Sequence, residues 1–140
     1  MTPLELRTRL YGVYHASRRG EVLVEQGLGG GVWRLQILES KERQLDSELA
    51  IERSFLVLAS CMHAGTRIVR VTQTQQDGSS EWDIRVLAEF TEHESMNYAS
   101  DVWKGVKSEP AEGGSSSDLL CVSSSFYDRR LCVWRVDLAQ

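Results

Sequence analysis

The feature that most constrains the fold of this chain is a pattern of apolar strand, small residues, polar turn and alternating strand. Its second copy spans residues 119–136, where an apolar-leaning run ends in three serines at 123–125 and an alternating strand follows toward Trp134. Alternating apolar and polar residues on both sides of a short polar turn are typical of a β-hairpin. We therefore expect an antiparallel hairpin in this part of the chain.

An earlier stretch has the same pattern. Residues 55–71 run from an apolar strand through small residues and a turn at 63–65 into an alternating strand. A segment with a tryptophan precedes each hairpin, at Trp33 and at Trp103, and residues 82–88 alternate as a fourth, outer strand should. Strands that recur in a fixed order indicate a repeat architecture.

Short strands in this order are typical of the blades of a WD-repeat β-propeller. We therefore predict an all-β fold, a WD-repeat β-propeller fragment of about two antiparallel four-stranded blades. Residues 1–28 are expected to be a remnant of a preceding blade, residues 29–90 a complete blade and residues 91–140 a last blade without its fourth strand. A closed propeller needs about four to eight blades. The chain is therefore expected to be part of a longer propeller.

Three polar stretches are predicted to connect the strands. Residues 38–54 are interpreted as a long connection, with a short helix as one alternative, and residues 73–80 as the link from third to fourth strand. Residues 104–118, rich in Ser, Glu and Gly, are expected to form a disordered loop. The short turns between the other strands are expected to meet on the opposite face of the blades. Functional residues are expected on that face, because binding and catalytic residues often lie on loops.

Composition excludes several functional classes. With 16 Lys and Arg against 20 Asp and Glu, the net charge is −4, which argues against a nucleic-acid partner. No apolar run has transmembrane length, so no membrane partner is expected. The three cysteines, Cys61, Cys121 and Cys132, form no CxxC pair and fit buried thiols of a cytoplasmic protein. No metal site and no cofactor are predicted.

Four segments of the chain also resemble a known family, the WD-repeat diphthine methyl esterases, which are also catalogued as diphthine methyltransferases. The segments occur in the family's order, within residues 29–136, and resemble its C-terminal half: residues 29–34, 58–65, 92–103 and 124–128. The resemblance implies hydrolysis of the methyl ester of diphthine on elongation factor 2, in diphthamide biosynthesis. It also implies that elongation factor 2 carrying this ester is the partner. A fragment that lacks half of the substrate channel is expected to be inactive alone.

Four residues have the order of the structural tetrad of WD repeats, in which hydrogen bonds hold one blade together. They are His93, one serine of the run at 123–125 that we take as Ser124, Asp128 and Trp134. Buried polar groups must be paired, so such a network fixes the geometry of a turn. We interpret these residues as structural and not as a catalytic dyad.

Two residues are candidates for catalysis. His63 lies in a turn where blades usually carry Asp, and an exposed imidazole there can act as a general base. The alternative is that His63 fills the Asp position structurally. Asp101 lies on a first strand that should approach the central channel. Backbone N–H groups of residues 29–31 are candidate donors to an oxyanion.

The substrate that the resemblance implies carries a trimethylammonium group, which aromatic faces bind. The candidate substrate-binding residues are Trp33, Arg34, Tyr98, Trp103 and Tyr127. For the tryptophans, the alternative is packing within the blades. For the whole chain, the alternative function is a non-catalytic WD-repeat scaffold that binds a protein partner.

Overall fold

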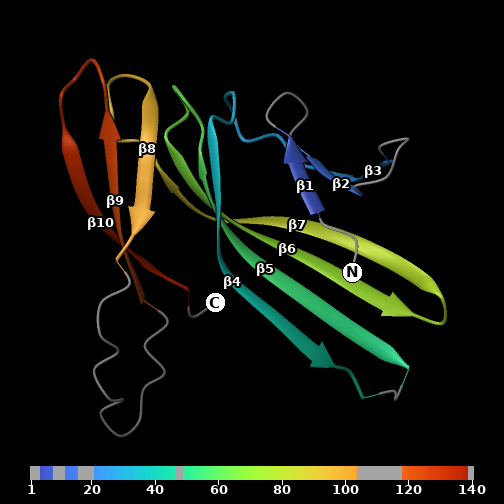
Figure 1. Ribbon diagram of the computed structural model, residues 1–140. Helices are drawn as coiled ribbons and strands as arrows, with labels where there is room; N and C mark the ends of the chain where they lie inside the picture. The colour runs from blue at the N-terminus through green and yellow to red at the C-terminus, as the bar shows by residue number, and fades with distance from the viewer. Residues whose placement is uncertain (1–3, 8–11, 16–20, 47–48, 104–117, 139–140) are drawn as a thin grey trace, which may run out of the picture.

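The structure, a computed structural model, describes residues 4–7, 12–15, 21–46, 49–103 and 118–138. These residues form ten β-strands and no helix, and the strands make three antiparallel sheets (Figure 1). The predicted fold class is confirmed: the described part of the chain is all-β, and its antiparallel sheets are consistent with a β-propeller fragment. Within these described ranges, no helix is long and apolar enough to cross a membrane.

The central sheet has four strands in sequence order. They are β4 (Arg34–Gln44), β5 (Ala50–Ser60), β6 (Thr66–Gln76) and β7 (Ser79–Phe90). Each strand pairs antiparallel with the next. The predicted hairpin of residues 55–71 is the β5–β6 pair, and the predicted outer strand is β7.

The expected connection at residues 38–54 is wrong, because most of it is strand. β4 continues to Gln44 and β5 begins at Ala50. The polar side chains in question pair across the two strands: Arg43 Nη2 lies 2.8 Å from Glu52 Oε1, and Arg53 Nε lies 2.7 Å from Glu42 Oε2. Charged cross-strand pairs on an exposed part of a sheet give a polar composition that is easily mistaken for a loop.

The expected link at residues 73–80 is also too long. β6 continues to Gln76 and β7 begins at Ser79, so only Asp77 and Gly78 connect them. Both residues have positive φ, 50° and 77°. Asp-Gly with two positive φ angles is a preferred two-residue turn of a β-hairpin.

A three-stranded sheet follows the central one. Its strands β8 (Asn97–Val102), β9 (Asp118–Ser125) and β10 (Leu131–Asp137) lie in the order β10-β9-β8. The predicted hairpin near the end of the sequence is the β9–β10 pair. The predicted disordered loop lies outside the described residues at 104–117, and Asp118 already belongs to β9.

The remaining sheet consists of β1 (Leu4–Arg7), β2 (Gly12–His15) and β3 (Glu21–Glu25), in that order. The three sheets fall within residues 1–28, 29–90 and 91–140, respectively. That these ranges are successive propeller blades stays a prediction.

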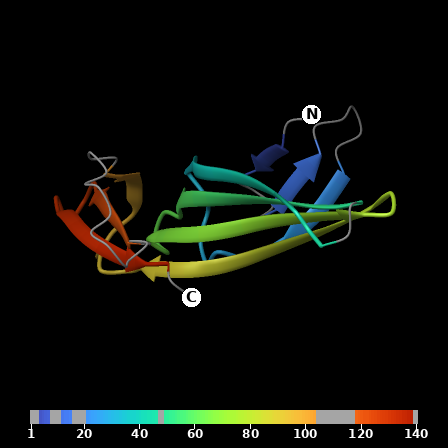
Figure 2. The same ribbon diagram turned by 90° about the horizontal axis from the view of Figure 1, so that it is seen from below.

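Two apolar cores flank the central sheet, because successive side chains of a strand point to opposite faces. Val57 and Ala59 of β5 face the first core, together with Leu28 and Val32. Leu56 and Leu58 face the second core, which also contains, from β8, β9 and β10, Val102, Cys121 and Val136. Leu23 and Val24 of β3 pack against the first core, so the two three-stranded sheets border different cores of the central sheet. In Figure 2 the β8–β10 sheet, orange to red, lies beyond one end of the central strands, and the blue β1–β3 sheet lies alongside their other half.

Candidate functional site

The glycine segment of residues 29–31 packs directly on the turn between β5 and β6. A Cβ atom on Gly30 would lie only 2.5 Å from the carbonyl oxygen of Cys61 and 3.0 Å from the Cβ of Ala64. Gly29 has a φ of +79°, which residues with a side chain rarely adopt. The segment can approach this turn so closely because it consists of glycine.

The β5–β6 turn holds its shape through backbone hydrogen bonds. The N–H of Cys61 donates to the carbonyl of Gly65 at 2.7 Å, and the N–H of Ala64 donates to the carbonyl of Cys61 at 2.9 Å. His63 is exposed in this turn and makes no hydrogen bond or ion pair with any other described residue. The turn therefore forms without the His63 side chain, which leaves the imidazole available.

A third segment, the start of β8, joins the same place. The backbone N–H of Asn97 donates to the carbonyl of Met62 at 2.9 Å, and Asn97 is fully buried. The next residue, Tyr98, meets Trp33 edge-on, with ring centroids 5.5 Å apart and planes at 83°. The glycine segment, the turn that carries His63 and the start of β8 thus converge. We call these three segments, residues 29–33, 61–65 and 97–98, the junction.

Asp101 lies three residues beyond Tyr98 on β8, about 10 Å along the strand. Its Oδ1 accepts hydrogen bonds from Gln36 Nε2 at 3.2 Å and from the backbone N–H of Val102 at 2.8 Å. Gln36 belongs to β4, so Asp101 links the first strands of two sheets. His63 and Asp101 do not contact each other.

The other predicted substrate-binding residues are spread more widely. Arg34 is exposed at the start of β4, next to the junction. Trp103, directly after the end of β8, is 73% exposed and lies about 17 Å along the chain from Tyr98. Tyr127 lies in the β9–β10 turn, where its ring meets that of Phe126. In the described part of the chain, the Trp103 and Tyr127 rings make no contact with the Trp33–Tyr98 pair.

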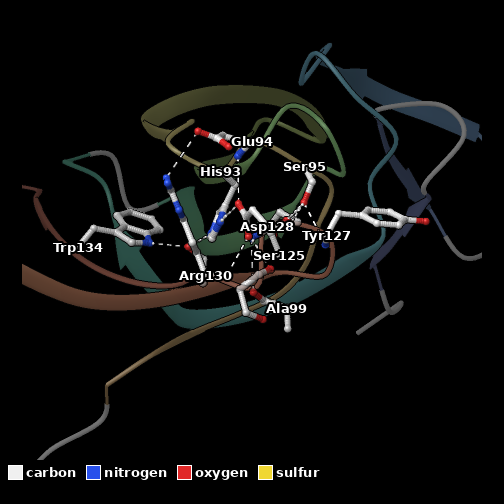
Figure 3. Close-up of polar contacts among 12 residues, drawn as sticks. His93, Glu94, Ser95, Ala99, Ser125, Tyr127, Asp128, Arg130 and Trp134 are labelled. Carbon is white, nitrogen blue, oxygen red and sulfur yellow. Dashed lines mark hydrogen bonds and ion pairs between the residues drawn. The ribbon is translucent and has the colours of Figure 1, made fainter.

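A separate buried network holds the β8–β10 sheet and its turn (Figure 3). Trp134 Nε1 donates to Ser123 Oγ at 3.1 Å, and Ser123 Oγ lies 2.9 Å from His93 Nε2. His93 Nδ1 lies 3.3 Å from Asp128 Oδ2. The indole can only donate and a carboxylate can only accept. The consistent arrangement is therefore Trp134 to Ser123, Ser123 to His93 and His93 to Asp128.

The serine of this network is Ser123 and not Ser124, so the assignment predicted from the sequence is wrong. Side chains alternate along β9, and Ser123 and Ser125 are buried on one face. Ser124 points to the other face and contributes its backbone carbonyl, which accepts a 3.3 Å hydrogen bond from Asn97 Nδ2. A run of three serines carries no signal for which of them faces inward.

Burial separates this network from any substrate. The side chains of His93 and Asp128 are 1% and 4% exposed. The Phe90 ring stacks on Trp134 at a centroid distance of 4.9 Å and meets His93 edge-on. Groups that are covered in this way cannot touch a substrate, so the arrangement favours the structural interpretation.

The carboxylate of Asp128 is held in its ionised form. Burial alone would raise the pKa of Asp128. Hydrogen bonds to the carboxylate lower it by more than that, so the pKa lies below its usual value. The backbone N–H groups of Arg130 and Glu94 donate to it at 2.9 and 3.1 Å, and His93 contributes as well. Hydrogen bonds to the charged form of a carboxyl group favour that form.

Two residues that help to build the junction could not be predicted from the sequence. Asn97 is a buried polar residue directly before Tyr98, and its backbone forms the link to the β5–β6 turn. Arg67 of β6 is 8% exposed, with its guanidinium beside Gly29. Neither carries a local signal, because each contact joins residues that are distant in sequence.

The comparison with known proteins yields one informative match. No family model matches the chain, and no solved structure matches it. The diphthine methyltransferase of Schizosaccharomyces pombe is 33% identical to this chain over 115 residues. The match covers 82% of this chain and 27% of that protein, so the chain spans about a quarter of its relative's length. The resemblance that the four motif segments predict is therefore confirmed: over most of its length, this chain is a homologue of diphthine methyltransferase.

Proposed function

We propose that this chain carries part of the active site of an esterase that hydrolyses the methyl ester of diphthine on elongation factor 2. The reaction would be a step of diphthamide biosynthesis, as the family resemblance implies, and the name of the S. pombe relative, diphthine methyltransferase, refers to the same modified residue and to a methyl group. The observation that carries the proposal is the junction, where a glycine segment, an aromatic pair and a histidine without a partner among the described residues meet.

His63 is the proposed general base. An imidazole without a hydrogen-bond partner can take a proton from an attacking water. The water oxygen then bonds to the ester carbonyl carbon, and the bond from this carbon to the methoxy oxygen breaks. The protonated His63 gives its proton to the methoxy oxygen, which leaves as methanol. The carboxylic acid that remains on the substrate releases its proton to solvent and becomes a carboxylate.

The glycine segment is proposed to stabilise the negative charge that develops on the carbonyl oxygen. None of the N–H groups of residues 29–31 donates to another described residue. Backbone donors fixed in advance are effective oxyanion ligands, and removing one typically costs about 10²–10³ in rate.

The aromatic pair is proposed to bind the trimethylammonium group of diphthine. Trp33 is 59% exposed and Tyr98 partly exposed, so both rings can offer surface to a cation. Asp101, further along β8, supplies a carboxylate for the same cation. Arg34, Trp103 and Tyr127 are proposed to contact the protein substrate around the modified residue.

The test is methanol release from elongation factor 2 that carries the diphthine methyl ester, with no methyl donor added. The enzyme is a chimera of the S. pombe protein in which the 115 matched residues are replaced by those of this chain, and the natural S. pombe protein is the reference. Methanol release by both proteins is expected, and the chain alone is expected to be inactive. A chimera that melts like the reference but releases no methanol contradicts the proposal.

A second candidate function, a non-catalytic protein-binding scaffold, is favoured by the β9–β10 turn. Phe126 and Tyr127 are 72% and 69% exposed there. The turn is held in place because Ser95 Oγ accepts hydrogen bonds from the N–H groups of Tyr127 and Asp128, both at 3.2 Å. Exposed aromatic residues on a fixed turn suit a binding surface. Tight binding of unmodified elongation factor 2, together with no methanol release from the form that carries the ester, would favour this candidate.

A further inference from the structure

Arg67 is a buried cation whose charge is incompletely satisfied. It lies opposite Ala59, on the face of β6 that borders the first core. Glu89 Oε2 lies 3.5 Å from Arg67 Nη1, within ion-pair distance, but Nη1 has no hydrogen-bond partner among the described residues. Charge-assisted hydrogen bonds of this type are about 2.7–2.9 Å long. A buried guanidinium is costly when its N–H groups lack acceptors.

The guanidinium reaches the junction. Arg67 Nη2 lies 3.5 Å from the position that a Cβ atom on Gly29 would occupy. The positive charge also acts on the neighbouring thiol: burial raises the pKa of Cys61 to about 11, and Arg67 opposes this rise. Arg67 is therefore close to both the glycine segment and the β5–β6 turn.

We propose that Arg67 and the N–H groups of residues 29–31 form a carboxylate-binding site. A carboxylate offers two oxygens with about four acceptor positions, and the planar guanidinium binds such groups through two parallel hydrogen bonds. Glu89, whose side chain is 57% exposed, lies at the edge of this site and competes with the ligand. The ligand replaces Glu89 as the partner of Arg67.

The natural ligand is the acid that ester cleavage releases, and this identity rests on the proposed function. The methyl ester is neutral, whereas the product carries one negative charge. A site with a guanidinium and several N–H donors therefore binds the product more tightly than the substrate ester, and it also favours the negative charge of the transition state.

The experiment titrates the chain with sodium acetate at constant ionic strength and follows backbone amide signals by NMR. We expect saturable shifts at residues 29–31 with acetate and none with methyl acetate, which has the same shape without the charge. Arg67→Met should weaken acetate binding about tenfold, the value of one charge-assisted contact. Glu89→Gln should strengthen it, because the competing carboxylate is gone. Arg85→Met, an exposed arginine of β7, is the matched control and should change nothing.

If Arg67→Met does not fold, acetate binding to the Glu89→Gln variant tests the site instead. This variant should fold, because Glu89 is exposed and the substitution keeps the size of its side chain. Absence of acetate shifts, or unchanged or weaker binding in Glu89→Gln, overturns the site. Stronger binding of inorganic phosphate than of acetate overturns its assignment to carboxylates. Acetate binding is measured without turnover. Binding without methanol release therefore supports the site and contradicts only the esterase function.

Discussion

The backbone N–H of Asn97 donates a 2.9 Å hydrogen bond to the carbonyl oxygen of Met62. This bond joins the start of β8 to the β5–β6 turn, one residue before His63 and one residue before Tyr98. The proposed base and the aromatic pair therefore take their relative position from backbone contacts. Backbone contacts of this kind hold a site more rigidly than flexible side chains do.

Gly30→Ala should destabilise the chain, because the new Cβ would lie 2.5 Å from the Cys61 carbonyl oxygen. Overpacking of this kind typically costs about 1–3 kcal/mol in the free energy of unfolding. The matched control is Gly27→Ala, where nothing lies within 4 Å of the new atom and the change should be near neutral. Urea denaturation measures both variants. An equal loss in both would show that the close packing of Gly30 does not matter.

Ser123→Ala should lower the free energy of unfolding more than Ser124→Ala does, although the two serines are neighbours. Ser123 is the partner of His93 Nε2 and Trp134 Nε1, and buried polar groups left without a partner cost about 1–3 kcal/mol each. The Ser124 side chain is outside this network, so its removal should change the free energy of unfolding by no more than about 0.5 kcal/mol. Thermal or urea unfolding of the two variants compares them directly. The reverse order would restore the assignment made from the sequence.

Acid should destabilise the chain partly through Asp128. Its pKa in the folded state is below the ordinary value of 3.8, so the folded state binds fewer protons than the unfolded state in this range. The stability that Asp128 contributes is present above about pH 4 and is lost as the pH falls toward the lower, folded-state pKa. Asp128→Asn should be less stable at neutral pH and should lose less stability between about pH 4 and 2. Melting temperatures of both proteins between about pH 4 and 2 test this prediction. Parallel curves would show that Asp128 does not cause the loss of stability in acid.

Alkali should destabilise the chain through two buried thiols. Burial raises the pKa of both Cys61 and Cys121 from 9.0 to about 11. The unfolded state therefore loses these protons first, so the thiols contribute full stability below pH 9 and lose it as the pH rises toward 11. The double variant Cys61→Ala, Cys121→Ala should show a smaller decrease in melting temperature across this window. A decrease as large as in the natural chain would show that other groups cause it.

The β-hairpins could be predicted from the sequence because one face of each is buried. Val57, Ala59, Val69 and Val71 recur at a spacing of two residues, and their burial produces that pattern. The outer halves of β4 and β5 could not be predicted in this way. Both faces of β4 are exposed there, β5 is only half-buried apart from Ala50, and charged pairs replace the apolar alternation. Polar composition alone does not separate an exposed strand from a loop.

The candidate site could be predicted only in part. His63 and Tyr98 lie in segments with recognisable motifs, and the structure places these segments side by side. Trp103 belongs to the same motif segment as Tyr98, but it lies at the other end of β8, because a strand extends about 3.4 Å per residue. Arg67 reads as an ordinary polar position of an alternating strand, and only its long-range contact with Gly29 shows its role.

The central claim, that the junction is an esterase site with His63 as its base, is tested most directly by the rate of methanol release in the chimera with His63→Ala. We expect a loss of about 10²–10⁴ in kcat, the usual contribution of a general base. The melting temperature should not change, because the turn forms without this side chain. Ser124→Ala serves as the control and should keep full activity. Full activity of the His63→Ala chimera, or its unfolding, would show that His63 is not the general base.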